Sequence, residues 1–150
     1  MHIQRTRDIY NLIFVLLVVS LAACKNPVER DDDHAEAEGL VLRMNGVDIV
    51  TVKEGRVTGG ISVKVETETD HIEIYFLNPH GERFKPTGDS YSLGWAMTDQ
   101  TIADVKQEPG KKWEIHIRGK KVGQTMLELR LLHAGHVDFR TPQIPVTVTP

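Results

Sequence analysis

Alternating apolar and polar residues run along much of the chain after residue 39, and this pattern is typical of half-buried β-strands. Over residues 61–66 the odd positions are Ile, Val and Val, and the even positions are Ser, Lys and Glu. Residues 71–76, 113–118 and 125–131 repeat the alternation. Because successive side chains of a strand point to opposite faces of a sheet, each run predicts one buried face and one solvent-facing face.

The breaks between these runs predict turns rather than helices. Asn78-Pro79-His80-Gly81 fits a type I turn, and Asn45-Gly46 and Pro109-Gly110 also interrupt the chain. The last predicted strand, residues 144–148, contains Pro145, which has no N–H to donate. We therefore expect that strand to lie at a sheet edge or to carry a bulge. No segment of ten residues has a helical apolar period, so the sequence predicts an all-β fold of two antiparallel sheets packed face to face.

The first 23 residues follow a different pattern. Arg5 and Arg7 precede an apolar stretch from Ile9 to Leu21, and the polar Lys25 follows soon after it. A transmembrane helix needs about 20 mainly apolar residues, so the stretch is too short to be a confident span. A positively charged start followed by a short apolar segment predicts a cleaved export signal over residues 1–23.

Cys24 is the only cysteine of the chain, which excludes an intrachain disulfide. The stretch Leu21-Ala22-Ala23-Cys24 resembles the lipobox of bacterial lipoproteins. The resemblance implies cleavage before Cys24, a diacylglycerol on its thiol and usually a third acyl chain such as palmitate. Such chains hold a domain at a membrane by burying methylene groups, at about 0.8 kcal/mol each. The alternatives are an ordinary signal peptide with a chance cysteine, or a thiol that awaits a disulfide partner.

The residue after the cysteine bears on localisation. Position 25 is a lysine. In lipoproteins that resemble those of the enteric bacteria, an aspartate there favours retention in the inner membrane. The resemblance therefore implies a protein that is exported and lipid-anchored to the cell envelope, at the outer membrane.

Residues 24–39 are charged and contain almost no large apolar side chain. Such a segment cannot bury enough surface to fold, so it predicts a disordered acidic tether between the anchor and a domain over residues 40–150. Within it, Asp31-Asp32-Asp33-His34 could bind a cation. A solvated linker is favoured, because flexible carboxylates must lose conformational entropy to chelate an ion.

Two segments of the predicted domain carry a family resemblance. Residues 95–105 contain a tryptophan and a D-x-x-I-A-x-V strand, and residues 119–129 contain G-x-x-x-G-x-T-x-L-x-L. They resemble the second half of a bacterial immunoglobulin-like domain of the Big2 type. The resemblance implies an immunoglobulin-like antiparallel β-sandwich. Because each tryptophan can bury 150 to 250 Å² of surface, we expect Trp95 and Trp113 to fill the core.

Charge and motifs narrow the classes of function. The chain has 18 Lys and Arg against 21 Asp and Glu with no long basic stripe, so nucleic acid is not an expected partner. It has no G-x-S-x-G, no H-E-x-x-H and no glycine-rich phosphate loop. Glu114 near His116 could be drawn as an acid-base pair, although a solvated strand face explains both residues. The sequence therefore predicts that the protein is not an enzyme. It predicts a lipid-anchored, non-catalytic binding module with an envelope protein as partner.

Histidines supply the alternative function. His133 and His136 flank Ala134-Gly135, a predicted turn that could bring both rings to one side, and Asp138 shares a strand face with His136. His116 lies on an outward face. Imidazoles with a carboxylate suit Zn(II) or Cu(II), so these four residues are the candidate ligands for periplasmic metal binding or delivery. Exposed histidines on strands and turns are also common without a metal.

Overall fold

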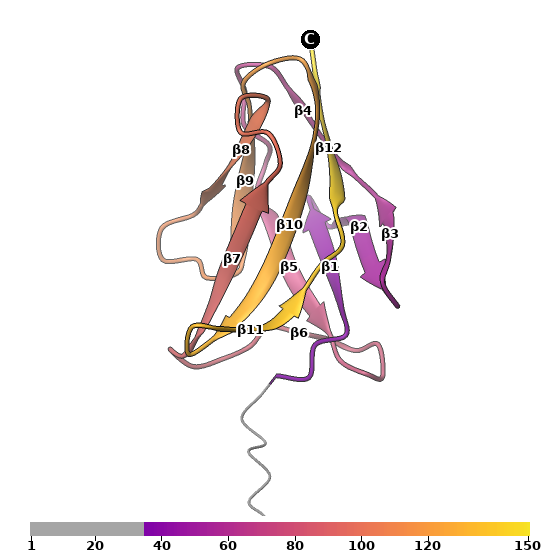
Figure 1. Cartoon of the computed structure of the whole chain (residues 1–150), viewed down its shortest axis with the longest axis vertical. Coiled ribbons are helices and arrows are strands. Elements are labelled where there is room, and N and C mark those ends of the chain that lie inside the picture. The colour runs from indigo at the N-terminus through magenta and orange to yellow at the C-terminus, as the bar shows by residue number, and fades with distance from the viewer. Residues whose placement is uncertain (1–34) are drawn as a thin grey trace, which may run out of the picture. The chain divides into compact units, whose positions relative to one another are not determined.

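The strands follow the alternating pattern from Gly39 to the end of the chain (Figure 1). The computed structural model describes residues 35–150, and every regular element within them is a strand. The predicted signal peptide and Cys24, the predicted site of lipidation, lie outside the described residues.

The described strands form two sheets. The first sheet has seven strands in the order β3-β2-β1-β5-β9-β8, with β6 paired to β5. Its members are β1 (Gly39–Met44), β2 (Val47–Lys53), β3 (Arg56–Gly59), β5 (Ile72–Leu77), β6 (Arg83–Phe84), β8 (Ala103–Gln107) and β9 (Glu114–Gly119). The second sheet has five strands in the order β11-β10-β12-β4, with β7 paired to β10. Its members are β4 (Ile61–Lys64), β7 (Tyr91–Met97), β10 (Gly123–His133), β11 (His136–Arg140) and β12 (Ile144–Thr149).

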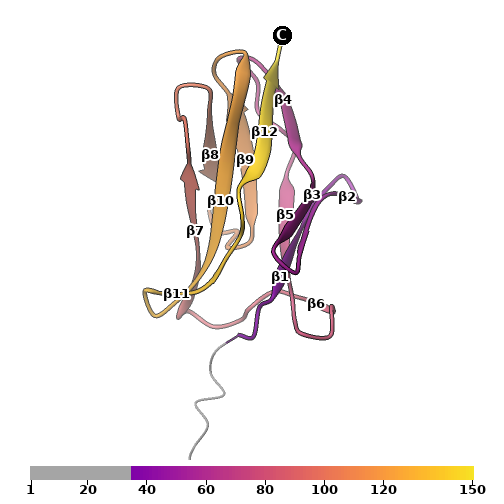
Figure 2. The same cartoon turned by 45° about the vertical axis from the view of Figure 1, so that its right-hand side comes forward.

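The two sheets pack face to face around one apolar core. In Figure 1, β7, β10 and β12 of the second sheet lie in front of β9, β5 and β1 of the first, and Figure 2 gives the turned view. Alternate residues along β5, β9 and the middle of β10 are fully buried: Ile72, Ile74, Phe76, Ile115, Ile117, Leu127, Leu129 and Leu131. The predicted all-β sandwich is confirmed. One pair departs from the antiparallel prediction, because β4 runs parallel to β12.

The two tryptophans have different environments, so the prediction that both fill the core is only half right. Trp113 is 7% exposed, packs edge-on against the Phe76 ring at 5.3 Å and donates from Nε1 to the carbonyl of Pro86 at 3.0 Å. Trp95 is 37% exposed. It pairs with Leu129 and therefore shares its inward face, but β7 has β10 as its one strand neighbour and lies at the edge of the sheet. At that edge the opposite sheet covers the indole incompletely.

The prediction for Pro145 is wrong. Strand β12 is an interior strand between β10 and β4, and its register with β10 runs from Gly123 to Leu127 without a shift. Proline fits there because pairing with β4 begins only at Val146. The sheet therefore tolerates a residue without an N–H at position 145, because β12 is not yet paired with β4 there.

The boundary of the tether also needs correction. Strand β1 begins at Gly39, and Ala35 and Ala37 pack against the core. The N–H of Ala35 donates to the Tyr91 hydroxyl at 3.0 Å, and the N–H of Glu38 donates to the carbonyl of Leu77 at 2.8 Å. Residues 35–39 thus belong to the domain, because small alanines and backbone groups supply contacts that composition alone does not reveal.

Candidate metal centre

Three potential metal ligands meet on the outward face of the first sheet. They are His71, Glu108 and His116, and one ligand atom from each lies within 4.8 Å of the other two. This is the one such group of three or more His, Cys, Asp or Glu side chains among residues 35–150. His71 immediately precedes β5, Glu108 immediately follows β8, and His116 lies in β9 between them.

Strand register brings the three side chains together. Ile72 pairs with Ile115 across β5 and β9, so the same antiparallel register places His71 opposite His116. On the other side of β9 the N–H of Glu108 donates to the carbonyl of Glu114 at 3.3 Å, which places Glu108 diagonally beside His116. Because residues that lie opposite each other share a face, all of these side chains point away from the core.

Backbone contacts fix the orientation of the His116 ring. Its Nδ1 lies 2.9 Å from the carbonyl oxygen of Thr69. A carbonyl oxygen only accepts hydrogen bonds, so Nδ1 carries the hydrogen and donates. Thr69 is held in turn by β9, because its N–H donates to the carbonyl of Ile117 and its hydroxyl accepts from the N–H of Ile117 at 3.0 Å. The neutral His116 ring therefore presents a lone pair at Nε2, as in many metal-binding histidines.

The Nε2 atom of His116 faces a carboxylate. The Nε2 atom of His116 lies 3.2 Å from Oε2 of Glu108, and the His116 side chain is 12% exposed. Two acceptors at this distance repel each other unless a cation, either a proton or a metal ion, lies between them. A nitrogen and an oxygen bound to one tetrahedral Zn(II) lie about 3.4 Å apart, given bond lengths of about 2.0 to 2.2 Å. The observed spacing fits two ligands of one ion.

His71 supplies the third ligand from the solvent side. Its ring centroid lies 4.5 Å from that of His116, and its side chain is 61% exposed. Oε2 of Glu114 lies 3.7 Å from Nδ1 of His71, close enough to bias the ring orientation by charge. One of its ring nitrogens already lies within 4.8 Å of the ligand atoms of Glu108 and His116, so a metal ion held there would have it as a third ligand. Two imidazoles and one carboxylate form a three-ligand set that leaves a fourth position open.

A neighbouring carboxylate on the same face already has its partners. Glu73 lies in β5, opposite Glu114. The Tyr75 hydroxyl donates to its Oε2 at 2.6 Å, and the Lys85 ammonium lies 3.2 Å from the same oxygen. These contacts, the hydroxyl first, hold the pKa of Glu73 below its ordinary value. Glu73 is therefore a charged part of the surface and is not needed as a ligand.

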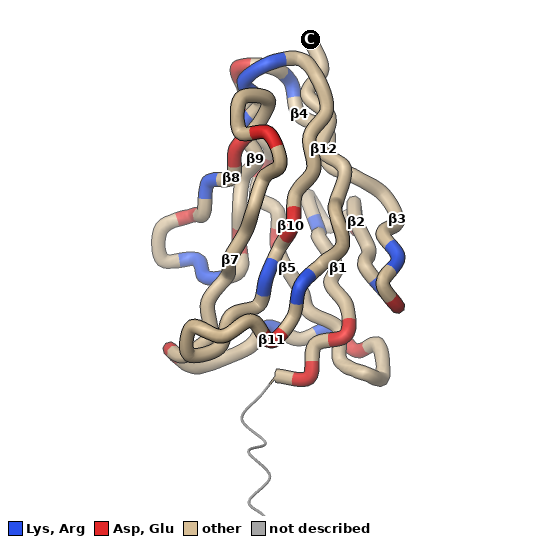
Figure 3. Tube along the Cα trace, viewed as in Figure 1, with Lys and Arg blue, Asp and Glu red and all other residues tan. Residues whose placement is uncertain are grey.

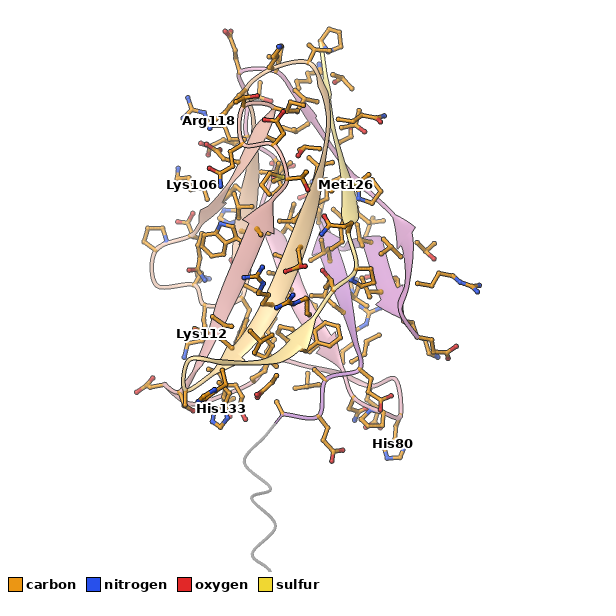
Figure 4. All side chains as sticks on the ribbon, in the orientation of Figure 1. His80, Lys106, Lys112, Arg118, Met126 and His133 are labelled. Carbon is orange, nitrogen blue, oxygen red and sulfur yellow. The ribbon has the colours of Figure 1, made fainter. Side chains whose placement is uncertain are left out.

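The predicted ligand cluster of His116, His133, His136 and Asp138 does not form. His116 lies in the first sheet, and the other three lie in the second. The ring of His133 stacks on that of Tyr91 at 4.4 Å, and its Nδ1 lies 3.8 Å from Oδ2 of Asp138. Figure 4 labels His133 near the lower end of the sandwich and Lys106, the cross-strand neighbour of His116, nearer the upper end.

The β10–β11 turn explains why sequence reasoning favoured the wrong set. His133 and His136 do pair across the predicted turn at Ala134-Gly135, where both turn residues have positive φ. His136, however, is exposed, while His133 is packed against an aromatic ring. Local spacing predicted the turn correctly but did not reveal what surrounds each ring.

Sequence reasoning missed His71 and Glu108, although one signal was present. Glu114 and His116 were recognised as neighbours on one outward strand face. The missing ligands are His71, 45 residues before His116, and Glu108, 8 residues before it; each lies just beyond the end of a strand that flanks β9. Only the pairing of β5 and β8 with β9 shows that those positions are adjacent.

Comparison with known proteins identifies no family. No protein-family profile and no curated protein matches the chain. Among solved structures, domains 4 and 5 of the S-layer protein SbsC are similar at 14% sequence identity, with a TM-score of 0.45. The similarity spans 62% of this chain and about half, 49%, of that one. Within residues 35–150, no helix is long and apolar enough to cross a membrane.

Proposed function

We propose that this chain is a lipid-anchored cell-envelope protein whose immunoglobulin-like domain is a non-catalytic binding module for a transition-metal ion, Zn(II) or Cu(II). The ligands are His71, Glu108 and His116. The observation that carries the proposal is the 3.2 Å approach of Nε2 of His116 to Oε2 of Glu108, with a ligand atom of His71 within 4.8 Å of both residues' ligand atoms. A metal ion satisfies both acceptors at once.

The support around the ligands has the form expected of a metal site. Histidine ligands usually donate their second N–H to a carbonyl or carboxylate, which fixes the tautomer and strengthens the ligand. His116 does so to the carbonyl of Thr69, and Oε2 of Glu114 lies 3.7 Å from Nδ1 of His71. Imidazole and carboxylate donors together suit Zn(II) and Cu(II) better than Ca(II) or Mg(II), which prefer oxygen alone.

The anchor supplies the location. The lipobox resemblance at Cys24 supports acylation, export and attachment to the outer membrane, with the domain on the periplasmic side. The ten residues from 25 to 34 separate Cys24 from Ala35, and they reach at most about 35 Å when fully extended. The partner expected in the envelope is then a protein that supplies or accepts the metal. Mass spectrometry of protein from its native host should show acyl chains on Cys24, and a bare thiol there would contradict the anchor.

Calorimetric titration tests the metal site. The full mature chain, purified in detergent without a histidine tag, should bind one equivalent of Zn(II) or Cu(II). His116→Ala should weaken binding by about 100-fold or more, because it removes a ligand and not merely a supporting group. His136→Ala is the matched control, since His136 also lies in a strand but belongs to the other sheet and to no ligand cluster among residues 35–150. Unchanged affinity in His116→Ala, or a comparable loss in His136→Ala, would contradict the proposed site.

A further inference from the structure

A pocket of about 400 Å³ adjoins one of the proposed ligands. It lies between β7 and the connection from β8 to β9, and Glu108 forms part of its wall. The other lining residues are Ser92, Leu93, Gln107, Pro109, Gly110, Lys111 and Lys112. Glu108 thus takes part both in the metal centre and in this pocket.

The pocket wall carries positive charge next to the metal centre. In Figure 3 an acidic segment on the β8–β9 connection is flanked by basic segments on both sides. Nζ of Lys112 donates to the carbonyl of Gly88 at 2.7 Å, which keeps its ammonium group beside the segment that leads into β7. Nζ of Lys111 lies 3.4 Å from Oε1 of Glu114, on the side of the metal centre.

The charge of a loaded centre is not balanced by its ligands. A divalent ion held by one carboxylate and two neutral imidazoles keeps one net positive charge. Glu114, whose Oε1 lies 3.4 Å from Nζ of Lys111, offsets the charge of that lysine, and Lys112 adds a further positive charge in the pocket wall. The fourth coordination position is open. A group that coordinates the ion through one oxygen and accepts from an ammonium through a second oxygen would complete the shell and offset the charge.

We propose that the metal ion and this pocket together bind a small carboxylic acid, whose carboxylate takes the fourth coordination position and pairs with Lys111 or Lys112. The inference rests on the proposed metal-binding function. A carboxylate supplies the single negative charge that the loaded centre lacks. The pocket volume is at the lower end of the range for small-molecule sites, and Leu93 and Pro109 give the acid a short apolar wall to contact.

Copper spectroscopy with acetate as the probe tests this site. The full mature chain is first loaded with one equivalent of Cu(II), and the electron paramagnetic resonance spectrum is recorded. Titration with sodium acetate should then change the spectrum in a saturable way, whereas sodium chloride at the same ionic strength should not. The double variant Lys111→Gln/Lys112→Gln should bind acetate about tenfold more weakly, because it loses the charge-assisted hydrogen bond. It should keep its affinity for Cu(II), because neither lysine is a ligand.

Lys121→Gln is the matched control, because Lys121 is an exposed lysine in the turn between β9 and β10, outside the pocket wall. Its acetate affinity should equal that of the unsubstituted chain. A copper spectrum that acetate leaves unchanged would overturn the carboxylate site alone, as would equal acetate affinity in the double variant. A chain that binds no copper before acetate is added would overturn the metal centre as well.

Discussion

Truncation of Trp113 to alanine is expected to lower the free energy of unfolding by about 3 to 5 kcal/mol. The indole is almost fully buried, contacts the Phe76 ring edge-on and donates a hydrogen bond to the carbonyl of Pro86. The variant loses the burial of the ring, leaves a cavity between the sheets and strands a buried carbonyl acceptor. Urea unfolding followed by circular dichroism measures the loss.

Trp95→Ala is the matched control for this prediction, since it removes the same side chain from the same sandwich. Trp95 is 37% exposed at the edge of the second sheet, so its loss should cost about 2 kcal/mol less than that of Trp113. Equal losses for the two variants would show that the edge position of β7 does not expose the indole in solution.

Zinc is expected to stabilise the folded chain strongly. A ligand that binds the folded state alone, at a free concentration 100 times its dissociation constant, adds about 2.7 kcal/mol. For a domain of this size that gain should raise the Tm by about 10 °C. Differential scanning calorimetry with and without Zn(II) measures the shift, which should fall close to zero in His116→Ala and persist in His136→Ala.

The outcome of that experiment separates a built site from surface binding. Weak binding of zinc to scattered histidines occurs in folded and unfolded chains alike, so it gives little net stabilisation. One proposed ligand lies in β9 and the other two lie next to the ends of β5 and β8, so the three meet only when the first sheet has formed. An equal rise in Tm for His116→Ala would show that zinc acts elsewhere.

The geometry gives the three ligands unequal roles. His116 is 12% exposed and its ring is fixed by the carbonyl of Thr69, so it is the preorganised ligand. His71 is exposed and approaches from solvent, which makes it the ligand that an incoming ion or an accepting protein meets first.

Much of the fold could be predicted because the alternation of apolar residues is a local property. The inward positions of β5, β9 and β10 are the ones that the sequence indicates, since a residue's face depends only on its parity along the strand. Positions whose environment depends on other strands were predicted less well. Pro145 proved to be interior, and Trp95 proved to be half exposed, because sheet order decides which strands have neighbours on both sides.

The candidate site shows the same division. His116 was identified from sequence as an outward-facing potential ligand. That orientation is confirmed, because His116 lies between the buried Ile115 and Ile117 in β9. Its partners could not be identified, because His71 and Glu108 become neighbours only through the registers of β5 and β8 with β9. The predicted partners His133, His136 and Asp138 were chosen for closeness along the chain, and they lie in the other sheet.

The sequence by itself determined that residues beyond 39 form strands, which side chains of each strand face inward, where the chain turns at Ala134-Gly135, and that the single cysteine ends a lipobox-like segment. Tertiary structure alone decided which strands pair, and therefore which outward side chains meet. The physical reason is that parity and turn preference are encoded within a few residues, whereas register is set by how two whole sheets bury their apolar faces together.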